Sequence, residues 1–514
     1  MNETPKAVQP AFKSPSAALS TKLKAAGLVG LGAVVGVALS LNFSAVAERQ
    51  NTTLNLPIEE VRMLSEVFGR IKSDYVEEVD DKRLIKEAIN GMLTGLDPHS
   101  AFLDADAFKE MQTVTTGKFG GLGIEVGMED GLVKVISPID DTPAFKAGIK
   151  SGDYIIKVGD TNLRGMNIND AVKRMRGEAG TEAVLTIIRK GESRELVFNV
   201  KRAEIQIQSV RARALEPGYA VVRLTQFEEA TAEKMVRAIN EAYKQNDGNL
   251  KGLVLDLRND PGGLLNASVA VSAAFLPKDA LVVYTEGRVE DAKLRLTARK
   301  ENYLRGPSRE DPLAKLNVGV KTVPVVVLVN NGSASASEIV AGALQDHKRA
   351  VIMGSQTFGK GSVQTILPLN NNTAIKLTTA RYFTPNGRSI QAKGITPDVM
   401  VDDGAQRLSM READLDRHLV GDDEKKALEQ LKKATSTGEA AKTQAANVAA
   451  ADEKPVEYKA ANAADGKPID FVLQQALNQL KGLPVASSPR ELVASATSGA
   501  AIKANTVAKS DKAR

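Results

Sequence analysis

The chain contains no cysteine and no tryptophan, and only three histidines occur among its 514 residues. Without cysteine there can be no disulfide, no thiol nucleophile and no cysteine-ligated zinc site. The histidines, His99, His347 and His418, form no HExxH pattern, so we expect no metal and no other cofactor. Aromatic residues make up 4% of the chain and the formal net charge is +5, which offers little for stacking on bases. We therefore expect no nucleic-acid partner.

The N-terminus carries a pattern typical of export. Lys22 and Lys24 precede an apolar stretch at residues 25–41, and Ala-Val-Ala at residues 45–47 is a candidate cleavage site. We expect residues 1–47 to be a signal peptide and the mature protein to be periplasmic. The alternative is an inner-membrane anchor formed by residues 25–41, since this stretch approaches the roughly 20 residues that span a bilayer.

Composition and periodicity divide the remaining chain into segments. Apolar residues at helical spacing follow residue 56, short β-like runs follow residue 116, and strands alternate with helices after residue 205. We expect a multidomain α/β protein with a helical assembly region at 56–115, a β-rich domain at 116–204, an α/β core at 205–403, a low-complexity linker at 404–466, a helix at 467–484 and a disordered tail at 485–514. The helix is isolated and amphipathic, so we expect its apolar face to bind a partner or a second copy.

The β-rich segment has an identifiable binding chemistry. Its sequence KFGGLGIEV at residues 118–126 can turn successive backbone N–H groups toward one anion and then accept an added strand. Residues 141–160 and 167–191 resemble the turn, groove helix and closing strand of a PDZ domain, which implies binding of a free C-terminus with an apolar last side chain. The expected carboxylate-binding residues are Gly120, Gly121, Leu122, Gly123 and Ile124. Arg176 on the groove helix could sense the bound peptide, and an ordinary surface arginine is the alternative.

The segment GSQTFGKGS at residues 354–362 nearly matches the phosphate-binding loop G-x-x-x-x-G-K-[ST]. Two features count against that function. Gly361 stands where the magnesium-binding hydroxyl is required, and the following residues predict a β-hairpin turning at 370–372 instead of a helix. We therefore expect no nucleotide, and Lys360 remains as a lysine on a glycine-flanked loop.

Three serines, Ser333, Ser335 and Ser337, alternate with small residues where the apolar run at 323–329 gives way to a predicted helix. Serine is favoured at helix N-termini, so all three can be structural. A serine hydroxyl also becomes a nucleophile when a neutral base takes its proton. The sequence alone therefore leaves a capping role and a catalytic role open.

The candidate bases are few. His347 lies at the far end of the same predicted helix, roughly 18 Å from Ser335 at 1.5 Å per residue, and cannot serve. His418 falls in a charged tail, and spacing does not exclude His99. Lysine can replace histidine if burial lowers its pKa, so Lys360 is a candidate for a Ser-Lys dyad.

Acyl transfer also needs donors for the developing oxyanion. The amide of Ala336 at the predicted helix start is one candidate, helped by the helix dipole. In LVLDLRNDPGGLLNAS at residues 253–268, an apolar strand ends in Asn-Asp-Pro-Gly-Gly, so the amides of Gly262 and Gly263 could approach a carbonyl closely. A plain turn between a strand and a helix is the alternative.

These motifs together resemble the carboxyl-terminal processing proteases, serine peptidases also called tail-specific proteases. The resemblance covers roughly residues 58–401 and rests on LDPHSAFL, the PDZ-like region, LRNDPGGLL, NNGSASASEIVAGAL, GSQTFGKGSVQ and RYFTPNGRSIQAKGITPDV. It implies that Ser335 is the nucleophile, Lys360 the general base and Gln364 the residue that orients the lysine. The implied oxyanion donors are the amides of Ala336 and either Gly262 or Gly263. The implied fold places a PDZ domain after the helical region and before a crotonase-like α/β protease core.

The resemblance implies a serine endopeptidase of the bacterial cell envelope that captures the C-terminal tails of proteins. Family members commonly assemble through their terminal helices, so we expect a homo-oligomer, and a lipoprotein adaptor is a further candidate partner. Two rival functions stay open from sequence. One is a non-enzymatic PDZ scaffold in which the serines only cap a helix. The other is a crotonase-like acyl-CoA enzyme, which explains neither the PDZ-like region nor the export pattern.

Overall fold

The computed structural model describes residues 57–139, 141–304, 310–403, 410–421, 425, 461–462 and 468–491. The expected signal peptide or anchor, most of the linker at 404–466 and the end of the tail lie outside the described residues. Within the described part of the chain, no helix is both long and apolar enough to cross a membrane.

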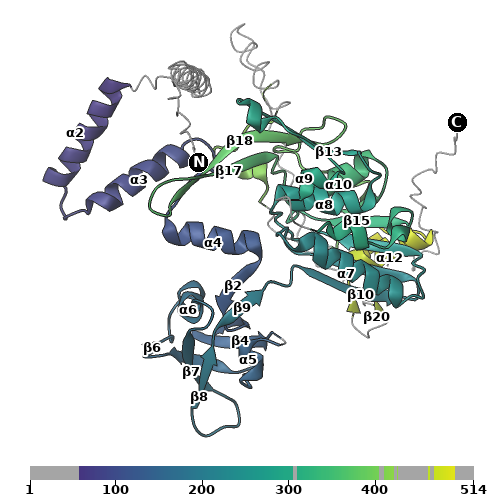
Figure 1. The fold of residues 1–514 in the computed structure, drawn as a ribbon, viewed down its shortest axis with the longest axis horizontal. Helices are drawn as coiled ribbons and strands as arrows, with labels where there is room; N and C mark the ends of the chain where they lie inside the picture. Colours follow the sequence, from purple (N-terminus) through teal and green to yellow (C-terminus); the bar gives the residue numbers. More distant parts are fainter. Residues whose placement is uncertain are drawn as a thin grey trace, which may run out of the picture. The chain divides into compact units, whose positions relative to one another are not determined.

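Two helices begin the described chain, α2 (Ile58–Asp74) and α3 (Asp81–Thr94) (Figure 1). α3 ends just before the Asp97-Pro98 step, because a residue preceding proline disfavours helical geometry. The region predicted as helical at 56–115 contains three helices and one short strand. β1 (Ala101–Leu103) intervenes before α4 (Ala105–Thr116), and it pairs antiparallel with β18 (Ala374–Phe383), a strand near the end of the core.

The β-rich domain is an antiparallel sheet in the order β3-β4-β5-β7-β8, with β6 beside β5. Its elements are β3 (Ile124–Glu129), β4 (Leu132–Pro138), α5 (Pro143–Lys146), β5 (Tyr154–Val158), β6 (Thr161–Asn162), α6 (Ile168–Met175), β7 (Glu182–Ile188) and β8 (Leu196–Lys201). Alternating side chains such as Val133, Ile155 and Leu185 are fully buried between the sheet and its helices. β2 (Lys118–Gly121) and β9 (Ala203–Gln206) pair antiparallel where the chain enters and leaves the domain.

The core contains a six-stranded sheet in the order β10-β11-β12-β15-β16-β19, parallel except for the β10–β11 pair. Its strands are β10 (Val210–Glu216), β11 (Tyr219–Leu224), β12 (Gly252–Asp256), β15 (Val325–Val329), β16 (Val351–Gly354) and β19 (Val399–Met400). β12 and β15 are buried at every residue, as expected for parallel strands covered on both faces.

Helices cover both faces of this sheet. α7 (Thr231–Lys244), α8 (Leu265–Phe275) and α10 (Ala336–Asp346) pack on one face, against Val325, Val327 and Val329 of β15. α12 (Phe471–Lys481) packs on the other face, against Val326 and Leu328. The apolar face of α12 is therefore buried in its own chain. Our expectation that this face awaits a partner or a second copy is wrong, because the core sheet needed a second cover.

A second, antiparallel sheet follows the order β1-β18-β13-β14, with β17 (Ser362–Pro368) also paired to β18. β17 and β18 form the hairpin predicted in place of a phosphate-loop helix, and Asn371 and Asn372 take positive φ at its turn. The remaining elements are β13 (Leu281–Gly287), η1 (Glu290–Ala292), β14 (Arg295–Thr297), α9 (Lys300–Tyr303), η2 (Pro312–Lys315), η3 (Val318–Lys321), η4 (Glu412–Asp414), β20 (Ala461–Asn462) and β21 (Pro468–Ile469).

Candidate active site

Ser335 occupies a strained turn between β15 and α10. It is the residue just before the helix, and its φ of 54° and ψ of −113° are values that non-glycine residues rarely adopt. Strain of this kind persists only where surrounding contacts enforce it, and it is concentrated at functional sites. Ser335 is half-buried, whereas Ser333 and Ser337 on either side are fully buried. Of these three serines, Ser335 is therefore the one that remains partly accessible to solvent.

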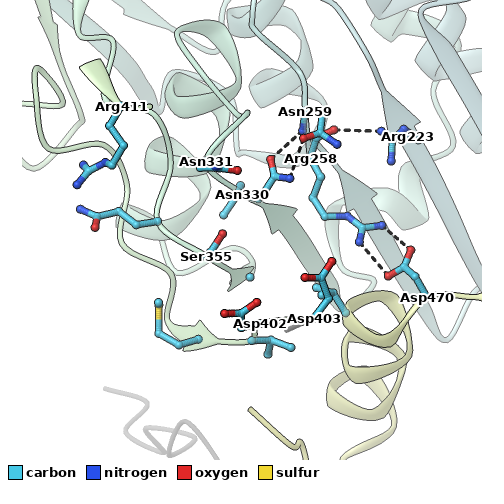
Figure 2. A pocket seen from close by; sticks show the side chains of 16 residues that line it. Arg223, Arg258, Asn259, Asn330, Asn331, Ser355, Asp402, Asp403, Arg411 and Asp470 are labelled. Carbon is cyan, nitrogen blue, oxygen red and sulfur yellow. Dashed lines mark hydrogen bonds and ion pairs between the residues drawn. The ribbon is translucent and has the colours of Figure 1, made fainter. Parts of the chain in front are cut away.

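Ser333 and Ser337 join the loop that carries Ser335 to the loop that follows β12. The hydroxyl of Ser333 donates to the carbonyl of Leu257 at 2.8 Å, and that of Ser337 donates to the carbonyl of Asp260 at 2.9 Å. Figure 2 shows a second link, in which the Asn330 side chain donates to Asn259 Oδ1 at 2.9 Å and accepts from the Asn259 backbone at 2.8 Å. These contacts fix the two loops against each other.

The same contacts bring the Gly-Gly turn against Ser335. A Cβ on Gly262 would lie 2.7 Å from Ala336 N and 2.8 Å from Ser335 Cβ, so only glycine allows this approach. The Gly262 amide donates to Asp260 Oδ1 at 2.9 Å. Within the described chain, no acceptor takes the N–H of Gly263 or that of Ala336. Two unused amide donors thus flank Ser335.

Lys360 lies on the loop between β16 and β17 and is half-buried. Burial lowers its pKa below the usual 10.5, and the positive charge of Lys376 lowers it further. The carboxylates of Glu412, Glu338 and Asp97 oppose this shift without reversing it. Among the described residues, no group hydrogen-bonds to Lys360 Nζ. A lysine in this setting can release its proton more easily than an exposed one.

Glu338 connects the serine and the lysine, and sequence reasoning missed it. Its Oε2 accepts the backbone N–H of Ser335 at 2.8 Å and that of Lys360 at 3.0 Å. Its Oε1 accepts from Thr357 Oγ1 at 2.5 Å and from the Gly359 amide at 2.7 Å. Although these four donors favour the charged form, complete burial raises the pKa of Glu338 from 4.5 to about 7.

Tyr382 on β18 is the second residue that the sequence did not reveal. Its buried hydroxyl donates to the carbonyl of Lys360 and faces the Ser335 side chain. Burial raises the pKa of Tyr382 well above 10.0, so the phenol stays neutral. Its role is to brace the lysine loop beside the serine.

Gln364 lies on β17 near this loop, but the structure gives it other partners. Its Nε2 donates to Ser362 Oγ at 3.0 Å and to Thr378 Oγ1 at 3.3 Å. In the described part of the chain it makes no hydrogen bond to Lys360. The geometry therefore places Gln364 beside the site without showing the orienting contact that the resemblance implies.

Asp260 lies beside the Gly-Gly turn and is fully buried. Its Oδ2 finds no hydrogen-bond partner in the described residues. Burial raises the pKa of Asp260 from 3.8 to about 7, and the hydrogen bond from the Gly262 amide only partly counters this effect. A carboxyl with its pKa raised in this way carries less negative charge near neutral pH than an ordinary aspartate beside the Gly-Gly turn would.

The PDZ-like domain holds an apolar groove of about 230 Å³ between β3 and α6. Four of the five predicted carboxylate-binding residues line it, namely Gly121, Leu122, Gly123 and Ile124. Gly120 does not line this groove and borders a neighbouring hollow instead. Side chains of Val126, Val172 and Met175 form the apolar part of the groove, which suits an apolar last residue.

Arg176 lies at the end of α6, on the rim of this groove. Its guanidinium stacks 5.0 Å from the ring centre of Phe119, and Nη1 lies 3.5 Å from Glu110 Oε1 on α4. Both Arg176 and Glu110 are exposed, so their ion pair is weak. Another anion can therefore replace Glu110 as the partner of Arg176.

A separate polar hollow of about 550 Å³ lies at the carboxyl ends of β12, β15 and β16 (Figure 2). Arg258 lines this hollow. Its guanidinium donates to Asp256 at 2.8 and 2.9 Å and to both oxygens of Asp470 at 2.9 Å. Asp470 caps α12, where it accepts the Leu473 amide. The positive charge of Arg258 is thus paired with the carboxylates of Asp256 and Asp470. These ion pairs fix α12 to the loop that carries the Gly-Gly turn.

Comparisons with known proteins identify the family of this chain. The model for peptidase family S41 matches residues 218–401, a PDZ domain model matches residues 120–200, and a model described as the activating protease CtpB N-terminal domain matches residues 36–107. A carboxy-terminal-processing protease of Bartonella bacilliformis is 45% identical over 401 residues, which cover 76% of this chain and 88% of that protein. The carboxy-terminal processing protease CtpA of Bacillus subtilis is 34% identical over 386 residues, covering 74% and 78%.

Among solved structures, a photosystem II D1 C-terminal processing protease is 31% identical, with coverage of 66% of this chain and 86% of that one and a TM-score of 0.38. The family matches define a serine-type peptidase with a PDZ domain. The chain belongs to the carboxy-terminal processing proteases of peptidase family S41. Neither a non-enzymatic scaffold nor an acyl-CoA enzyme therefore describes it.

Proposed function

We propose that this protease cleaves its substrates with a Ser335–Lys360 dyad after the PDZ domain has captured their C-terminal tails. The observation that carries the proposal is the shared Glu338 oxygen, which binds the backbone amides of the strained Ser335 and of the half-buried Lys360. Burial of Lys360 supports the role of base, because the ammonium is disfavoured there.

In the proposed reaction, Ser335 Oγ attacks a peptide carbonyl while Lys360 Nζ takes its proton. The Lys360 ammonium then gives a proton to the leaving amine, which departs as a new N-terminus and leaves an acyl-enzyme. Water, deprotonated by the again neutral Lys360, attacks the ester and releases the new C-terminus. The apolar groove beside Gly121–Gly123 supports capture of the tail, and a tail carboxylate could replace Glu110 as the partner of Arg176.

The hydrogen bonds favour one of the two candidate oxyanion glycines. The Gly262 amide is already used by Asp260, whereas the amides of Gly263 and Ala336 have no acceptor among the described residues. We therefore assign the oxyanion contacts to Gly263 and Ala336, with Gly262 as the residue whose lack of a side chain permits the approach.

Incubation of the purified chain lacking residues 1–47 with tail-bearing envelope proteins tests this function. Mass spectrometry of the new C-termini should show fragments with the wild type and none with Lys360→Ala or Ser335→Ala. An amidated tail, which removes the carboxylate, should be cut more slowly. Identical fragments from wild type and Lys360→Ala would refute the dyad.

We also propose export to the periplasm, on the basis of the basic flank, the apolar stretch at 25–41 and the Ala-Val-Ala sequence. N-terminal sequencing of the protein from cell envelopes should find Glu48 as the first residue. Retention of residues 25–41 in a membrane fraction would favour the anchor instead.

Self-assembly is a further proposal, and it now rests on the N-terminal helices alone. α2 buries none of its residues, and Val61, Leu64 and Val67 form an exposed apolar stripe on it. Changing Val61 and Leu64 together to lysine should reduce the sedimentation coefficient, and an unchanged coefficient would exclude α2 as the contact. The lipoprotein adaptor stays a prediction.

A further inference from the structure

The turn at residues 97–100, singled out in the sequence as LDPHS, is built into the protease core. Asp97 Oδ1 accepts the amides of His99 and Ser100 at 2.8 and 2.9 Å and the hydroxyl of Thr378 at 3.0 Å. Ser100 Oγ donates to Asp97 Oδ2 at 2.7 Å and accepts the Thr378 amide at 3.1 Å. Asp97 and Ser100 are buried. The turn is therefore rigidly attached to β18, the strand that also carries Tyr382.

From this turn the His99 ring reaches a buried carboxylate. Its Nε2 lies 2.8 Å from Glu412 Oε2 and 3.0 Å from Oε1, and Glu412 is fully buried. A buried carboxylate needs donors, and His99 and Gln391 supply them; Gln391 Nε2 donates to Glu412 Oε1 at 2.9 Å. In the sequence, His99 comes before the protease core and Glu412 comes after it. Their contact therefore joins two segments that are far apart in the chain.

Glu412 and Gln391 contact the lysine loop on the two sides of Lys360. The Glu412 amide donates to the Phe358 carbonyl at 3.1 Å, before the lysine. The Gly361 amide, after the lysine, donates to Gln391 Oε1 at 3.0 Å. A loop with glycine on both sides of Lys360 has few conformational restraints of its own, so these external hydrogen bonds and those of Glu338 define its shape.

We infer that His99 and Glu412 are positioning residues of the protease, which hold the loop of Lys360 so that its amine reaches the Ser335 hydroxyl. The inference rests on the proposed Ser335–Lys360 dyad. His99 acts through Glu412 and Gln391 and does not touch the substrate. Its ring nitrogen Nε2 is engaged by Glu412, and no hydrogen bond joins His99 to Ser335 in the described residues.

The arrangement also predicts an electrostatic signature that a purely structural contact would lack. The charged groups that face Lys360 are Lys376 on β18, Glu412, Glu338 on α10 and Asp97. Removing the negative charge of Glu412 should lower the pKa of Lys360 further, because that charge favours the ammonium form. Since only neutral Lys360 accepts a proton, the rising limb of kcat/KM against pH should then move to lower pH. Replacing His99 by glutamine leaves the Glu412 charge in place and should not move the limb in that direction.

The test measures kcat, KM and their pH dependence on one tail-bearing substrate, for the wild type, His99→Leu, His99→Gln and Glu412→Gln. His347→Gln and Glu290→Gln are matched controls, because both residues are exposed and outside the site. We expect His99→Leu to lose kcat by on the order of 10²-fold with little change in KM. His99→Gln, which keeps a donor for Glu412, should recover part of that loss, and Glu412→Gln should shift the limb to lower pH.

Each outcome decides a separate question. If His99→Leu and Glu412→Gln keep the wild-type kcat and pH profile while Lys360→Ala is inactive, the positioning role is wrong and the dyad stands. If Lys360→Ala keeps activity, the dyad itself is wrong. If Lys360→Ala is active and His99→Gln is inactive, His99 is the base and the positioning role is also wrong. Thermal unfolding identifies a variant that fails to fold, and in that event the pH profiles of His99→Gln and Glu412→Gln decide.

Discussion

Ser335 and Lys360 donate their backbone N–H groups to the same carboxylate oxygen, Oε2 of Glu338, at 2.8 and 3.0 Å. The proposed nucleophile and base come from different loops, one before α10 and one before β17. A single buried oxygen sets their separation before any substrate arrives. Preorganisation of this kind lowers the reorganisation needed at the moment of reaction.

The first prediction concerns that oxygen. Glu338→Gln replaces one carboxylate oxygen by an amide nitrogen, which faces backbone donors and cannot accept from them. We expect kcat to fall by on the order of 10²-fold and the free energy of unfolding to fall by roughly 1–3 kcal/mol. Glu233→Gln on the exposed face of α7 is the control and should change neither quantity. Full activity of Glu338→Gln would show that the shared oxygen has no part in alignment.

The second prediction is a pH dependence of stability at Asp260. The folded protein holds this proton up to about pH 7, whereas the unfolded chain releases it near 3.8. Folding therefore takes up a proton between these values, and the stabilisation is complete below 3.8 and lost as pH rises through 7. Asp260→Asn cannot ionise and keeps an acceptor for the Gly262 amide.

Urea unfolding of wild type and Asp260→Asn at pH 5 and pH 8 checks this prediction. The variant should gain stability relative to the wild type at pH 8, by on the order of a few kcal/mol. Asp291→Asn, which changes an exposed carboxylate, should track the wild type at both pH values. A difference between wild type and Asp260→Asn that does not depend on pH would contradict the raised pKa of Asp260.

The third prediction concerns Gly123 in the PDZ groove. It separates the effect of a steric clash with an added Cβ from the effect of backbone strain at a positive φ. Gly123 and Gly131 both have positive φ, at 78° and 74°. A Cβ on Gly123 would lie 2.3 Å from Thr142 Cβ, whereas one on Gly131 would meet nothing within 4 Å. Gly123→Ala should therefore weaken binding of a free-carboxylate tail peptide by about 10-fold or more, and Gly131→Ala should not. Fluorescence anisotropy measures both, and equal losses would mean that the collision is irrelevant to binding.

The fourth prediction concerns α12. A chain that ends at residue 467 loses this helix and exposes the sheet face formed by Val326 and Leu328. Because each large side chain returned to water costs roughly 1.5–3 kcal/mol, we expect a strongly lowered Tm and aggregation. A chain that ends at residue 491 keeps α12 and should unfold like the full protein. An unchanged Tm after removal of α12 would show that the second face of the sheet needs no cover.

The parts of the site that sequence reasoning located are those with local patterns. Ser335 follows an apolar strand and precedes a helix. Lys360 precedes a hairpin whose turn consists of asparagines. Such features depend on neighbours in the chain, so spacing and turn residues are enough to find them. Glu338 had a local signal too, since Ser335 followed three residues later by glutamate is a capping-box pattern.

Tyr382 and Glu412 had no such signal, and His99 lies in the motif LDPHSAFL, which does not reveal its partner. Their partners lie far away in the sequence, and only the folded core brings them to the lysine loop. The helix α12 was found but given the wrong partner for the same reason. The run Val325–Val329 is apolar at every position, which indicates burial on both faces, and this pattern could have pointed to a helix on the second face.

The central claim, that Lys360 activates Ser335, is tested most directly by a serine-reactive fluorophosphonate probe. The chain has no cysteine, so thiols do not compete. Mass spectrometry should place the label on Ser335, at a rate that rises with pH around a midpoint below 10.5, because burial lowers the pKa of Lys360. Lys360→Ala should lose this rise and react at least about 10³-fold more slowly. Labelling of Ser335 at an undiminished rate in Lys360→Ala, or labelling of a different serine in the wild type, would contradict the account.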